Sequence, residues 1–147
     1  MSPGGATRKR SIIMSNRSMM PDFLQTENLY IGCGDGWVYQ YGVVGMVLRG
    51  KGKVMENEIK SMVVSSDKKT VWVGDRYGHL KRVGVDGGGG RGLEVEKEYD
   101  GVHMNCVSGL AISKNNGYLY TASWDASVKK INLITQEVED QWENSSR

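Results

Sequence analysis

Residues 119–131 read LYTASWDASVKKI, and two earlier stretches follow the same plan: LYIGCGDGWVYQY at residues 29–41 and VWVGDRYGHLKRV at residues 71–83. Their first residues lie 42 apart (29 to 71) and then 48 apart (71 to 119). Each stretch has two runs rich in β-branched and aromatic residues on either side of a tight turn, which predicts a β-hairpin. A hairpin that recurs at this interval indicates a repeat architecture, in which each unit buries its face by stacking on its neighbours.

The composition fits a chain of short strands. The 147 residues are 39% hydrophobic and 24% charged, which is close to ordinary globular values. Glycine is about twice as frequent as usual, with 20 residues, whereas the only prolines are Pro3 and Pro21. Proline removes a donor from a β-ladder, so its absence after residue 21 suits hydrogen-bonded strands. The net charge of +2 gives no reason to expect nucleic acid as the default partner.

Strands are predicted wherever Val, Ile, Tyr and Trp concentrate between turn residues. From Leu29 onward eleven such runs are found, near 29–33, 37–43, 45–49, 59–65, 70–74, 79–84, 93–98, 107–113, 118–123, 127–132 and 137–142. The stretch from Lys53 to Met62 has no convincing apolar stripe at helical spacing, so we expect a loop that enters a strand.

Residues 1–27 differ from the rest and are predicted to form a basic, disordered N-terminal arm. Its apolar interruption, Ile12-Ile13-Met14, is a candidate edge strand. The triplet Arg8-Lys9-Arg10 has the composition of a nuclear-import patch, but such triplets are common by chance and a solvated tail is the simpler interpretation. The remaining chain divides into units at 28–50, 51–98 and 99–143, with a tail at 144–147.

The third unit carries the most diagnostic residues. His103 precedes a strand in which Val107, Leu110 and Ser113 recur at three-residue spacing, and the turn that follows the next strand contains Asp125. This arrangement resembles a blade of the WD-repeat β-propeller family, with Ile131 where the family usually has a tryptophan. The resemblance implies that His103 and Asp125 are hydrogen-bonded and tie a loop to a turn inside one four-stranded sheet.

The other two units keep this frame less well. In the second unit the strand spacing returns as Ile59, Met62 and Ser65, but Met55 stands at the histidine position and Tyr77 at the aspartate position. In the first unit Asp35 occupies the aspartate position and Tyr41 the tryptophan position. Its innermost strand is the least defined, and Ser11 to Ser15 is the candidate.

The resemblance therefore covers about residues 28 to 143 and implies an all-β fold: a partial β-propeller of about three four-stranded antiparallel blades. Propellers close with about four to eight blades. Three blades leave two open end faces, so we expect a longer propeller, self-association, or a second chain that completes the ring. A β-sandwich of about eleven strands is the alternative, although a sandwich does not require this repeat.

No catalytic residue, cofactor site or metal site is predicted, and the chain is not expected to be an enzyme. Residues 45–52 read GMVLRGKG, which is one residue short of a phosphate-binding loop because Gly52 replaces the required Ser or Thr. Nucleotide binding at Lys51 is thus a weak alternative to a cationic hairpin loop. His79 is expected to be an exposed polar residue at a strand start. Cys33 and Cys106 are expected to be buried free thiols.

The expected function is a non-enzymatic scaffold for protein–protein interaction, with partners docking on the rim where the turns between second and third strands emerge. Arg76, Tyr77 and Trp124 are the candidate contact residues, because tryptophan and arginine are enriched in interface hot spots. Packing of Trp124 on its own neighbouring loop is an equal alternative. A ribonucleoprotein role, through the arm and through Lys51, Lys53, Lys81 and Arg82, is the competing hypothesis.

A cytoplasmic location is expected, with the nucleus as the alternative. The sequence has no apolar run of transmembrane length, and its first residues lack the apolar core of a signal peptide.

Overall fold

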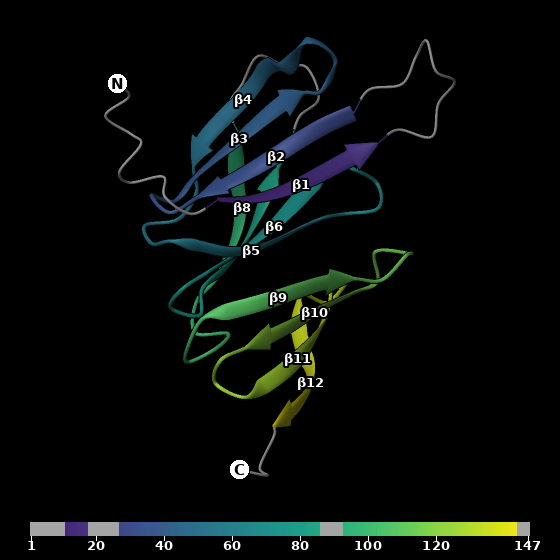
Figure 1. The fold of residues 1–147 in the computed structure, drawn as a ribbon. Helices are drawn as coiled ribbons and strands as arrows, with labels where there is room; N and C mark the ends of the chain where they lie inside the picture. Colours follow the sequence, from purple (N-terminus) through teal and green to yellow (C-terminus); the bar gives the residue numbers. More distant parts are fainter. Residues whose placement is uncertain (1–10, 18–26, 86–92, 144–147) are drawn as a thin grey trace.

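The computed structural model describes residues 11–17, 27–85 and 93–143, which form three four-stranded antiparallel sheets (Figure 1). The first sheet contains β1 (Ser11–Arg17), β2 (Glu27–Cys33), β3 (Trp37–Gly42) and β4 (Val47–Lys53). The second contains β5 (Ile59–Val64), β6 (Thr70–Asp75), β7 (Leu80–Gly84) and β8 (Glu94–Tyr99). The third contains β9 (Val107–Ile112), β10 (Tyr118–Ser123), β11 (Ser127–Asn132) and β12 (Glu137–Glu143). In every sheet each strand pairs with the next one along the chain.

The all-β prediction is confirmed, and all eleven predicted strands are present. The candidate inner strand of the first unit also exists: it is β1, and it extends from Ser11 to Arg17. The rest of the proposed arm (1–10 and 18–26) and the tail at 144–147 lie outside the described residues.

One predicted strand was placed wrongly. The strand expected at residues 45–49 begins at Val47 and continues to Lys53, because Gly45 and Met46 have left-handed φ values of 77° and 49° that interrupt the extended chain. The preceding residues, Val44–Met46, form a short 3₁₀ turn. As a result β4 runs across the boundary drawn between residues 50 and 51.

The three sheets stack side by side, and the first strand of the second sheet, β5, lies between β1 and β9 (Figure 1). Side chains that alternate along β6 fill the two spaces between the sheets, because successive residues of a strand point to opposite faces. Val71 and Val73 are buried with Tyr30 and Val38 of the first sheet. Trp72 instead joins a second core with residues of the third sheet, Leu119 and Ile131.

The same turn contact joins the first sheet to the second and the second to the third. The backbone N–H of Met55 donates to the Gly36 carbonyl (3.1 Å), and that of His103 donates to the Gly78 carbonyl (3.3 Å). Both glycines have φ near +90°, and a Cβ on either would lie within 2 Å of a carbonyl oxygen of the incoming loop. The equivalent turn of the third sheet carries Ala126, also with positive φ.

Within the described ranges, no helix is long and apolar enough to cross a membrane.

Candidate functional site

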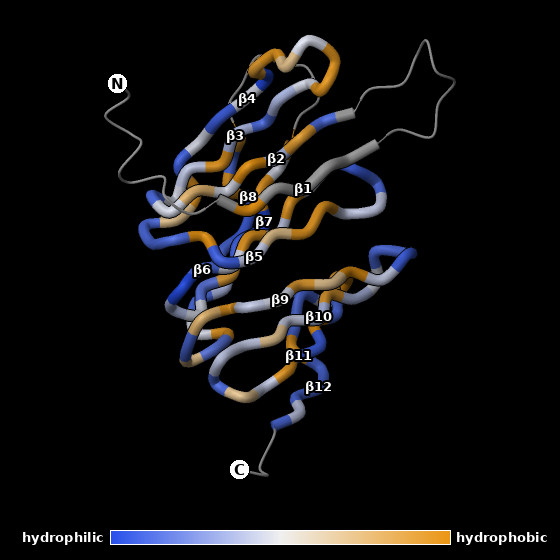
Figure 2. Tube along the Cα trace, viewed as in Figure 1, coloured by the Kyte–Doolittle hydropathy of each residue, from blue (hydrophilic) through white to orange (hydrophobic). Residues whose placement is uncertain are grey.

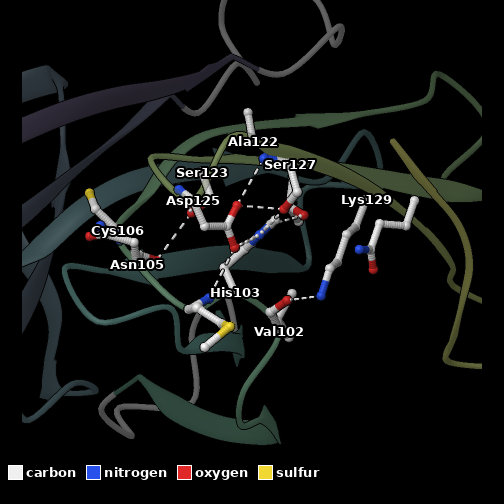
Figure 3. Close-up of polar contacts among 12 residues, drawn as sticks. Val102, His103, Asn105, Cys106, Ala122, Ser123, Asp125, Ser127 and Lys129 are labelled. Atoms are coloured by element: carbon white, nitrogen blue, oxygen red, sulfur yellow. Dashed lines mark hydrogen bonds and ion pairs between the residues drawn. The ribbon is translucent and has the colours of Figure 1, made fainter. Parts of the chain in front are cut away.

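The turn between β10 and β11 is fixed by a buried histidine from the loop before β9 (Figure 3). The Nδ1 atom of His103 lies 3.0 Å from Oδ2 of Asp125 and 2.9 Å from Oγ of Ser127. Its Nε2 atom lies 2.7 Å from Oγ1 of Thr121 on β10. The pair that the resemblance implied for His103 and Asp125 is therefore present, and it joins a loop to a turn 22 residues away.

Asp125 is the centre of this network. Its carboxylate also accepts the backbone N–H groups of Met104 (3.0 Å) and Ser127 (2.9 Å), and the Ser127 hydroxyl (2.5 Å). Burial alone would raise the pKa of Asp125, but these hydrogen bonds, together with the one from His103, hold its pKa well below the usual range. The carboxylate is therefore charged over the whole physiological pH range.

His103 is neutral in this network. Burial lowers the pKa of the imidazole, and this effect outweighs the opposing influence of Asp125. Because a carboxylate can only accept, Nδ1 carries the proton, and Nε2 accepts a hydrogen bond from the Thr121 hydroxyl. The imidazole is only 2% exposed and both nitrogens are engaged. It holds the turn in place and does not present an acid or base to a substrate.

The second sheet holds its equivalent turn with a different pair. Asp75, at the end of β6, accepts the backbone N–H groups of Tyr77 and His79 (2.9 Å each) on one oxygen. Its other oxygen lies 2.7 Å from Nδ1 of His79 and 3.4 Å from Nδ2 of Asn57. His79 is a partly exposed polar residue at the strand start, as expected, but its ring is also held by a carboxylate four residues earlier, and the sequence did not indicate this contact.

In the first sheet, Asp35 stabilises its own turn. One carboxylate oxygen accepts the backbone N–H of Trp37 at 3.2 Å, as the Asp125 carboxylate does for Ser127. The histidine position of the second sheet holds Met55, which is buried and apolar. The three turns thus share one backbone form, and the second and third turns have different side-chain ties.

These ties support a group of exposed side chains on one rim. Tyr77 is 59% exposed on the β6–β7 turn, and Trp124 is 61% exposed on the β10–β11 turn. Met104 is 93% exposed on the loop between them, which is bonded to the first turn through Gly78 and to the second through Asp125. Three large apolar side chains are therefore exposed on backbone segments that hydrogen bonds hold in place.

Cationic groups of the second sheet border this rim. The Lys60 ammonium lies 5.4 Å from the centre of the Trp124 ring, within the range of a cation–π interaction. The Arg76 guanidinium is half exposed and lies 3.8 Å from a carboxylate oxygen of Glu58. One face of Trp124 is therefore covered by a side chain of the neighbouring sheet, while most of the ring faces solvent.

The other candidate chemistries find little support. Residues 45–52 form part of a 3₁₀ turn and of β4, with no helix after them. In the described part of the chain, no three His, Cys, Asp or Glu side chains are grouped to hold a metal ion. Lys81 and Arg82 are each 3.2 Å from a glutamate of β8, so their charges are balanced locally. Cys33 and Cys106 are buried free thiols.

Four residues of the turn network and the rim were not predicted from the sequence. Thr121 and Ser127 complete the His103 network, and the alternation of β10, which places Thr121 on the same face as buried Leu119, could have indicated the first of them. Met104 and Lys60 join the rim through contacts between sheets, for which the local sequence carries no signal.

No protein-family model matches the chain, and no curated protein matches it. Solved structures do. The chain is similar to the RRP9 WD40 repeats and to U3-55K, each with a TM-score of 0.70 at 20% identity over 80% of this chain. It is also similar to the β-propeller domain of Myceliophteria thermophila Cps50 (Swd1), with a TM-score of 0.69 at 12% identity. It spans only 35%, 36% and 40% of those chains, respectively. The fold is therefore that of a partial WD40 β-propeller, and each sheet is one blade.

Proposed function

We propose that this partial WD40 β-propeller is a non-enzymatic docking module that binds protein partners on the rim of Tyr77, Met104 and Trp124. Propellers of this fold generally serve as protein-interaction scaffolds. The observation that carries the proposal is the exposure of these three side chains on turns and a loop that are held by hydrogen bonds. A backbone that is held in place before binding loses little entropy when a partner arrives.

The residue types on the rim match those of interface hot spots, where tryptophan, tyrosine and arginine dominate the binding energy. Trp124 supplies the largest apolar surface, and Lys60 places positive charge beside it. A peptide that presents an apolar side chain next to a carboxylate would complement both features.

Selection from a random-peptide display library, with the immobilised chain as bait, tests this proposal. Peptides that bind the rim should lose at least about 2 kcal/mol, or roughly 30-fold in affinity, on Trp124→Ala. Isothermal titration with synthetic versions of the selected peptides gives the affinities. The matched control is Ile134→Ala, because Ile134 is also exposed on a turn but at the opposite end of the same blade. Peptides that tolerate Trp124→Ala as well as they tolerate Ile134→Ala would contradict the assignment.

A further inference from the structure

The open face of the first blade carries residues of the kind that are buried between blades. In the second blade the positions that face the first blade are filled by three fully buried valines, Val71, Val73 and Val83. The equivalent positions 42 residues earlier are on the face of the first blade that points away from the second, and they hold Leu29, Ile31 and Tyr41.

The open face of the third blade shows the same property. In the second blade, Trp72 and Leu80 are buried against the third blade. The equivalent residues 48 positions later, Tyr120 and Val128, point away from the second blade, and Trp142 lies opposite Val128 on the neighbouring strand. Terminal units of repeat proteins normally end in a polar capping face. Both end faces of this stack instead carry large apolar residues.

Residue sizes at the two ends are complementary. At the internal interfaces a glycine of one blade receives the first residue of the next blade's inner strand: a Cβ on Gly32 would lie 2.8 Å from a methyl of Ile59, and one on Gly74 would lie 2.6 Å from a methyl of Val107. The third blade has Ala122 at this position, and the remaining inner strand, β1, begins with Ser11. In an interface between the two ends, an alanine would replace the glycine of the internal interfaces, and a serine would replace the isoleucine or valine that packs on it.

Charges on the outer strands select the same pairing. The outer strand of the first blade, β4, contains Arg49, Lys51 and Lys53 and no acidic residue, and of these Lys53 has a carboxylate oxygen of Glu56 at 3.9 Å. The outer strand of the third blade, β12, contains four acidic residues and no basic one, and it is hydrophilic along most of its length (Figure 2). Contact between unlike ends brings these opposite charges together, whereas contact between like ends brings like charges together.

From these features we infer that two copies of this chain associate head to tail, with the third blade of each copy packed on the first blade of the other, to close a six-bladed ring. The three described blades of each copy would together make six, which lies within the range of about four to eight blades of closed propellers. The two contacts are related by a twofold axis, which gives a closed assembly. The occupant of both open faces is therefore a second copy of the chain.

The mass of the full chain in solution tests this directly. Sedimentation equilibrium over a range of concentrations should give twice the monomer mass at high concentration and no larger species. A mass that stays at the monomer value would overturn the proposal. A mass that keeps increasing with concentration would also overturn it, because it would indicate an open chain of copies instead of a ring.

Charge reversal then identifies the faces. Lys51 and Lys53 lie opposite Tyr39 and Trp37, and the double variant Lys51→Glu, Lys53→Glu should weaken the dimer at least ten-fold. The double variant Glu137→Lys, Asp140→Lys on β12 should do the same. A chain that carries all four changes should regain the dimer, because both outer strands then change sign together.

The variant with all four substitutions also controls for folding. If it fails to dimerise while its circular dichroism and melting temperature match the wild type, the head-to-tail pairing is wrong. A dimer that is unaffected by either double variant would place the contact on another face and would equally refute the proposal.

Discussion

Equivalent turns of the second and third blades are held by different polar groups. In the third blade the carboxylate of Asp125 lies inside the turn and binds a histidine from a loop 22 residues earlier. In the second blade Asp75 lies before the turn and binds His79 only four residues later. One tie connects two distant segments and the other is largely local. Loss of the His103–Asp125 contact should therefore loosen the loop before β9, whereas loss of the His79–Asp75 contact should act mainly on its own turn.

The backbone of the two turns offers the strongest test of this comparison. Gly78→Ala should lower the free energy of unfolding by about 3 kcal/mol, because the new methyl would meet the His103 carbonyl and strain a left-handed residue. Ala126→Gly, at the same position one blade later, should change the free energy of unfolding by less than about 1 kcal/mol. Glycine adopts the positive φ of this position without strain, and no steric clash is created. Urea denaturation measures both. Equal effects would show that the incoming loop does not depend on the glycine.

Substitution of the two histidines should give the next largest change in the free energy of unfolding, and the two changes should differ. His103→Gln leaves the Thr121 hydroxyl and the Asp125 carboxylate without their buried partner and should cost about 2 kcal/mol. His79→Gln should cost about 1 kcal/mol or less, because the His79 side chain is 37% exposed and water can replace it. Amide hydrogen exchange at Met104 should accelerate only in the His103 variant. Exchange that accelerates in both would mean that the two ties are equivalent.

A shift to mildly acidic pH should have the smallest effect on stability. The pKa of His103 is lowered by burial from its ordinary value of 6.5, so the unfolded chain takes up a proton more readily than the folded one. The contribution of His103 is therefore complete above about pH 7 and is lost as the pH falls through 6.5 toward the lower folded value. The melting temperature should fall from pH 7 to pH 5, and His103→Gln should flatten this slope. The lowered pKa of Asp125 acts only at more acidic pH. A slope unchanged by His103→Gln would exclude this role.

The sequence was sufficient for the fold because the three hairpins repeat both their turns and their alternating apolar residues. The tie between His103 and Asp125 followed from the resemblance. The tie between Asp75 and His79 did not, because neither residue stands at the positions where the resemblance places the histidine and the aspartate. The contact of Lys60 with Trp124 depends on how far one blade is rotated against the next, which is a property of the packed sheets and not of either strand.

Pairing of every strand with its neighbour along the chain has a consequence for biosynthesis. Each sheet is complete as soon as its own residues have left the ribosome, since no strand waits for a partner encoded far downstream. The second sheet can settle on the first while the third is still being translated, which favours ordered folding from the N-terminus.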